Sequence, residues 1–272
     1  MRIRTTVMQA FKAQVWHLAA IAALQLSSHA AMAQNDRGPD FVIGASLAST
    51  TLSFDEKLDA DPNFPSYALF GSVAWDRAYA NLSFADAFGT SNISEEDEIG
   101  TASRTDLDLT FGYRFNGNWT GFLGYRDGRT EIDFQVRDTD IFQEEYYRED
   151  GFYIGASYAI TFQQAGTLSF NAALIDFDSD LRFTAGVEDD EEEDDEEEDI
   201  EAVEFDDLEG RFSGSSSGFS VGVSWVMPIA NQFAFRALYK LNDYDLEVAS
   251  DDGLFEPDQQ LRYLEVGLLY AF

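Results

Sequence analysis

Residues 104–126 read RTDLDLTFGYRFNGNWTGFLGYR, and every second side chain from Leu107 to Phe115 is apolar. Successive side chains of a β-strand point to opposite faces, so a period of two residues predicts a strand. The tripeptide Asn116–Gly117–Asn118 comes next, and Asn and Gly favour tight turns. The stretch therefore predicts a β-hairpin with one apolar face and one small, polar face.

The tight turn also predicts the register of this hairpin, in which Phe115 pairs with Trp119. Register matters because it decides which side chains share a face. Counting back along both strands places Asp108 beside Arg126, on the polar face. The sequence thus predicts an ion pair there.

The same alternation recurs along the rest of the chain after Ala33. Short turns alternate with long connectors, which is typical of transmembrane barrels. We therefore predict an all-β fold, a transmembrane antiparallel up-and-down β-barrel of about ten strands, with eight or twelve as the alternatives. The predicted strands are 40–54, 67–75, 78–87, 104–115, 119–134, 150–162, 167–183, 217–228, 232–248 and 259–272.

The last two predicted strands give a second register. We pair Phe233 with the final residue, Phe272. This pairing places Phe235 beside Tyr270 on the outer face, and Lys240 beside Glu265 on the inner face. It predicts a second inward ion pair.

Aromatic side chains on the outward face lie close to the short turns. Amphipathic rings prefer the boundary between lipid and water, so they predict a membrane girdle at the periplasmic rim. The alternative is the aromatic core of a soluble barrel. The girdle residues are Trp75, Trp119, Trp225, Tyr113 and Phe233.

The final strand reads LRYLEVGLLYAF over residues 261–272. It resembles the terminal strand of Gram-negative outer-membrane β-barrel proteins, with alternate outward apolar residues and a final aromatic. The resemblance implies that Tyr270 and Phe272 form an assembly signal for the barrel assembly machinery. It also implies that outer-membrane lipid and lipopolysaccharide surround the protein.

The N-terminal residues 1–33 are typical of a secretory signal peptide. Arg2, Arg4 and Lys12 precede an apolar stretch, and Ala31-Met32-Ala33 ends the segment. The alternative is a membrane anchor, but the apolar run is shorter than the roughly 20 residues that a spanning helix needs. We predict cleavage after Ala33, export to the Gram-negative outer membrane, and a single barrel domain over residues 34–272.

Composition excludes several classes of function. The sequence has no Cys, and both of its His residues lie within residues 1–33. The remaining chain carries 14 basic against 51 acidic residues. Nucleic-acid binding is excluded because it depends on Lys and Arg, and the usual His-based and Cys-based catalytic sites are absent. We therefore expect no enzyme.

Charged and hydroxyl side chains are predicted to face the lumen. A barrel of about ten strands is nearly filled by its own side chains. These residues therefore form a structural ion-pair network, or they line a narrow path for small solutes. They are Asp106, Asp108, Arg114, Arg126, Arg236, Lys240, Tyr263 and Glu265.

Residues 188–199 are twelve consecutive acids. A run of like charge repels itself, so we predict a disordered outer loop over residues 184–216. It is a solvated spacer, or it binds Ca²⁺ or Mg²⁺ weakly through several carboxylates; no other cofactor is expected. The candidate metal ligands are Glu188, Asp189, Asp190, Asp194, Asp195 and Asp199.

Together these features favour a non-enzymatic envelope protein that acts through its outer loops, in surface interaction or structural support. The alternative is a narrow, porin-like channel for small solutes or ions. A third hypothesis is a carboxylate-based surface hydrolase using a pair such as Asp176 and Asp245.

Overall fold

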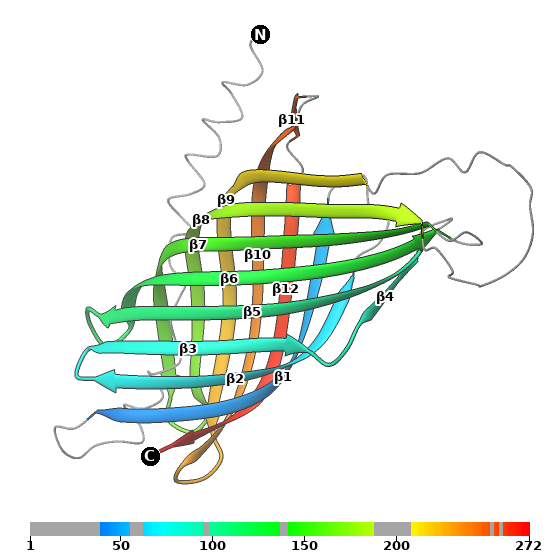
Figure 1. The fold of residues 1–272 in the computed structure, drawn as a ribbon. Coiled ribbons are helices and arrows are strands. Elements are labelled where there is room, and N and C mark those ends of the chain that lie inside the picture. Colours follow the sequence, from blue (N-terminus) through cyan, green and yellow to red (C-terminus); the bar gives the residue numbers. More distant parts are fainter. Residues whose placement is uncertain are drawn as a thin grey trace, which may run out of the picture.

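The computed structural model describes residues 39–54, 62–94, 98–136, 141–187, 208–250, 253–255 and 258–272. All the regular elements within these ranges are β-strands. The described residues therefore contain no helix that is long and apolar enough to cross a membrane. The strands form one closed antiparallel sheet (Figure 1). They are β1 (Asp40–Phe54), β2 (Asn63–Trp75), β3 (Ala78–Ala87), β4 (Ser91–Ser94), β5 (Glu98–Arg114), β6 (Trp119–Val136), β7 (Ile141–Phe162), β8 (Gly166–Val187), β9 (Leu208–Pro228), β10 (Phe233–Ser250), β11 (Gly253–Phe255) and β12 (Asp258–Ala271).

The barrel closes where β12 pairs with both β1 and β10, while the other long strands pair with their neighbours in sequence. The two short strands only extend the rim. β4 pairs with β5 beyond the end of β3, and β11 pairs with β10 in the same register as β12. The predicted barrel of ten strands is therefore confirmed.

The predicted register of the first hairpin is confirmed, because Asp108 lies opposite Arg126. The predicted register of β10 with β12 is wrong by two residues. Phe233 lies opposite Tyr270, and Lys240 lies opposite Tyr263 rather than Glu265. A shift by two residues keeps every side chain on its face, so the alternation that fixed the faces could not detect it.

Cysteine pairs test this register. We expect Phe235→Cys with Leu268→Cys to form a disulfide on oxidation, because these residues lie opposite one another, within reach of an S–S bond. Phe235→Cys with Tyr270→Cys is the matched control. Its diagonal partners are about 7–8 Å apart. The chain has no other cysteine, so mass spectrometry after alkylation counts the remaining thiols directly. Faster oxidation of the control pair would contradict the register.

The strands extend further at their outer ends than predicted. β8 runs to Val187 and β9 begins at Leu208, so residues 184–187 and 208–216 of the predicted outer loop are strand. β7 begins at Ile141 rather than at 150. In β7 and β9, both faces of these extensions carry polar side chains, so the alternation fades although the backbone ladder continues. The predicted signal peptide and the acidic run 188–199 lie outside the described residues.

The outward face carries a band of exposed apolar side chains. Leu82, Phe111, Ile154, Leu174 and Leu268 are each more than half exposed. Soluble proteins rarely expose apolar patches of this extent, whereas a lipid-facing surface requires one. The band identifies the side of the sheet that faces the membrane.

Candidate functional site

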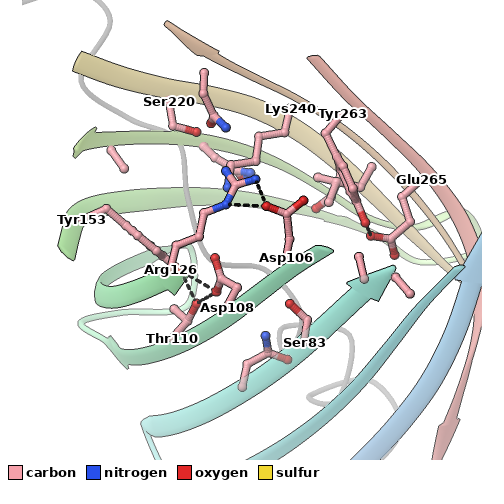
Figure 2. A pocket seen from close by; sticks show the side chains of 18 of the residues that line it. Ser83, Asp106, Asp108, Thr110, Arg126, Tyr153, Ser220, Lys240, Tyr263 and Glu265 are labelled. Carbon is pink, nitrogen blue, oxygen red and sulfur yellow. Dashed lines mark hydrogen bonds and ion pairs between the residues drawn. The ribbon is translucent and has the colours of Figure 1, made fainter. Parts of the chain in front are cut away.

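The middle of the barrel encloses a cavity of about 180 Å³ (Figure 2). Of the side chains predicted to face the lumen, all but Arg114 line it. Arg114 ends β5 at the short-turn side and lies outside the lining. The predicted residues that line the cavity are Asp106, Asp108, Arg126, Arg236, Lys240, Tyr263 and Glu265.

Asp106 is the centre of the largest interior ion-pair network among the described residues. Its Oδ1 lies 2.7 Å from Arg126 Nη2 and 3.0 Å from Arg104 Nη2. Arg104 also lies 3.6 Å from Glu149 Oε2, and it donates a hydrogen bond of 2.7 Å to Thr130 Oγ1. Both arginines are buried, so each guanidinium depends on these carboxylates for compensation.

The predicted ion pair between Asp108 and Arg126 is wrong, although the two residues lie opposite one another. Arg126 turns along the strand to Asp106. Asp108 instead accepts hydrogen bonds from the Tyr153 hydroxyl at 2.7 Å and from Thr110 Oγ1 at 2.8 Å (Figure 2). An arginine side chain is long enough to reach either of two carboxylates on the facing strand.

The predicted ion pair between Lys240 and Glu265 is also wrong, because of the register shift. Glu265 Oε1 lies 3.2 Å from Arg236 Nη1, and Glu265 Oε2 accepts a hydrogen bond of 2.9 Å from Tyr263. The Arg236 guanidinium also lies 4.8 Å from the centroid of the Phe70 ring. Arg236 is therefore the cation that compensates Glu265.

Sequence reasoning missed Arg104 and Glu149. Arg104 stands at the edge of its predicted strand, and Glu149 falls in a predicted loop. The alternation of Tyr147 and Glu149 with outward residues continues the inner face of β7 beyond that loop boundary, and both are buried. These two residues could have been found by continuing the inward alternation beyond the apolar part of each strand.

Two clusters of buried apolar side chains, here called layers, flank the cavity along the barrel axis. The layer nearer the short turns contains Val42, Phe70, Val226, Ala234 and Leu269. The layer nearer the outer loops contains Leu52, Phe64, Ala102, Ile132, Ile175, Phe177, Tyr244 and Leu261. The interior is thus a polar cavity between two apolar layers. This arrangement can hold a small polar solute but leaves little room for bulk water.

The predicted girdle residues lie at the short-turn end of the strands. Trp75, Tyr113, Trp225 and Phe233 are exposed, whereas Trp119 packs against Tyr158 with the ring centroids 5.0 Å apart. In the predicted assembly signal, the rings of Tyr270 and Phe272 contact each other at 4.9 Å.

A second aromatic row, which the sequence analysis missed, lies on the outward face further from the short turns. The Tyr67 hydroxyl donates a hydrogen bond of 3.0 Å to Asp86, and the Tyr125 hydroxyl donates one of 2.7 Å to Asp150. On the outward face of its strand, each tyrosine is the last aromatic residue before the outer end. Together with the first row, these residues mark both edges of the apolar band.

The predicted metal ligands Glu188, Asp189, Asp190, Asp194, Asp195 and Asp199 all lie outside the described residues. Within the described part of the chain, no group of three or more Asp, Glu, His or Cys side chains could hold a metal ion.

The carboxylate pair considered for hydrolysis lies on the outward face. Asp176 and Asp245 both pair with Ser217 of β9. They are thus two strand spacings apart, about 10 Å. This exceeds the separation of about 5–5.5 Å in retaining glycosidases and lies at the upper limit for inverting ones. The pair gives no positive support for catalysis.

No protein-family model matches the sequence, and no curated protein matches it. Among solved structures, the chain is similar to the translocator domain of the autotransporter NalP from Neisseria meningitidis. The TM-score is 0.51 at 12% sequence identity, over 99% of this chain and 98% of that chain. It is also similar to the outer membrane protease OmpT from Escherichia coli, with a TM-score of 0.47 at 11% identity over 86% of this chain and 96% of that chain. The likeness to the translocator domain shows that the chain has the fold of an outer-membrane β-barrel.

Proposed function

We propose that the protein is a non-enzymatic barrel of the Gram-negative outer membrane whose lumen is closed and whose work is done at its outer end. The fold and the exposed apolar band support the location. One observation supports the proposal that the lumen is closed, which is that the central cavity lies between two layers of inward apolar side chains. We further propose that the chain is exported after cleavage behind Ala33 and that the machinery assembling it reads Tyr270 and Phe272.

The outer ends of β6 to β9 support a role in surface interaction. β7 and β8 each have 22 residues, whereas a transmembrane strand needs about 9–11. Beyond the apolar band, their outward side chains form a lattice of ion pairs. Arg148 Nη2 lies 3.0 Å from Asp127 and 3.3 Å from Asp150 Oδ1, and Arg129 Nη2 lies 2.9 Å from Asp127. This ordered, polar sheet extends β6 to β9 away from the membrane (Figure 1).

A narrow channel is the second candidate, because the central cavity is lined by charged side chains of both signs. Solute movement through it would require both apolar layers to open. The two candidates differ in one measurable property, which is steady ion conductance.

Planar-bilayer recording of the refolded protein separates them. On this proposal we expect no discrete conductance steps from the wild type, because Phe70 and Phe177 are large members of the two apolar layers that flank the cavity. The variant with Phe70→Ala and Phe177→Ala removes one large side chain from each layer and should conduct in discrete steps. Electrophoretic mobility of heated and unheated samples in detergent gels checks that both proteins fold, because a folded barrel and its unfolded chain migrate differently. Ion-selective steps from the wild type would overturn the closed-lumen proposal in favour of the channel.

A further inference from the structure

One wall of the central cavity carries polar side chains from β8, β9 and β10, and we call this part of the cavity the hollow. Gly222 of β9 lies directly between Asn171 of β8 and Lys240 of β10. A Cβ atom at this position would lie 2.9 Å from Asn171 Nδ2 and 2.9 Å from the Tyr239 carbonyl oxygen, so only glycine leaves room for the Asn171 side chain beside it. In the next row, Ser220 lies opposite Asn242. Figure 2 shows Lys240 and Ser220 reaching into the cavity from these neighbouring strands.

Two amides in this wall point to a bound group. Asn242 is fully buried, and neither its side-chain nitrogen nor its oxygen has a hydrogen-bond partner. Asn171 Oδ1 is likewise buried without a partner. An unsatisfied buried polar group costs about 1–3 kcal/mol. Both amides line the cavity, so a polar ligand there would satisfy them.

The charges around the hollow indicate the sign of that ligand. Arg126 is paired with Asp106, and Arg236 is paired with Glu265. Lys240 contacts the face of the Tyr153 ring, with Nζ 5.7 Å from the centroid. Among the described residues, no carboxylate oxygen lies within 4.0 Å of its ammonium group.

Two carboxylates, Asp106 and Asp108, line the same cavity. Asp106 is held by two arginines. Asp108 accepts hydrogen bonds from Tyr153 and Thr110. Asp108 therefore keeps its negative charge and attracts Lys240 from beyond ion-pair distance, so an anion in the hollow has to lie closer to Lys240 than to Asp108.

We propose that this hollow binds a small monovalent anion, of the size of chloride or formate. Lys240 supplies the positive charge, and the amide of Asn242 and the hydroxyl of Ser220 supply hydrogen-bond donors. Gly222 leaves room for the Asn171 side chain beside them. The cavity of about 180 Å³ is too small for a sugar acid and its hydration shell but large enough for such an anion with a few waters. The site is independent of whether the lumen conducts.

Salt-dependent unfolding tests the site, because a ligand that binds only the folded state raises stability. We expect the urea midpoint of the refolded wild-type protein to be higher in sodium chloride, and in sodium formate, than in sodium gluconate at the same ionic strength. Gluconate is too large for the hollow. Lys240→Met and Asn242→Leu each remove one ligand group and should have the same midpoint in all three salts.

Arg262→Gln is the matched control. It removes an exposed positive charge from the outward face of β12 and should keep the wild-type difference between salts. Because Lys240→Met and Asn242→Leu both alter the site, the test remains valid if one of them fails to fold. Equal wild-type midpoints in chloride, formate and gluconate would overturn the proposal and leave a hollow that holds water. The same difference between salts in Lys240→Met as in the wild type would overturn it as well.

Discussion

Asp106→Ala should lower the free energy of unfolding by about 3–5 kcal/mol, the range measured when one partner of a buried ion pair is removed. The carboxylate lies 3.0 Å from Arg104 and 2.7 Å from Arg126, whose side chains are 2% and 9% exposed. Its removal leaves Arg126 without an ion-pair partner among the described residues. Arg104 keeps its hydrogen bond to Thr130 and the longer ion-pair contact of 3.6 Å with Glu149.

Urea unfolding of the protein refolded into lipid vesicles measures this loss. Asp180→Ala is the matched control, because Asp180 pairs at 3.3 Å with an Arg211 side chain that is 61% exposed. Exposed pairs contribute roughly 0–1 kcal/mol. Equal losses for the two variants would show that the interior network is hydrated like the surface, which contradicts the closed lumen.

The strand count and the register of the hairpin around Asn116–Gly117–Asn118 could be predicted from the sequence. Asn116 Oδ1 accepts hydrogen bonds from the backbone N–H of Asn118 and Trp119. A local turn held in this way fixes which residues face each other. No such turn joins β10 and β12, whose ends are separated by a longer connector, so their register depends on packing between distant residues.

The partners of the interior charges could not be predicted from register alone. Opposite residues such as Asp108 and Arg126 share a face, but a guanidinium reaches diagonal neighbours equally well. The two apolar layers escaped prediction for a related reason. Alternation assigns each face one character, whereas the inner face changes from apolar to polar and back along the strand, as Ala234, Lys240 and Tyr244 of β10 show.

Leu123→Arg should lower the free energy of unfolding by about 2–4 kcal/mol in lipid vesicles, because an arginine would then face the hydrocarbon near the bilayer midplane. Leu123 lies on the outward face of β6 between Phe111 and Ile154, and all three side chains are exposed.

Glu131→Arg is the matched control on the same strand and the same face, eight residues further from the turn. It lies beyond Tyr125 and Asp127, where the outward face has become polar, and should change stability by less than about 1 kcal/mol. Urea unfolding in vesicles measures both variants. In water, an exposed leucine can be replaced by arginine at little cost, so a large difference between the two positions requires a hydrocarbon surround. Equal, small losses of stability at both positions would mean that the apolar band does not face lipid.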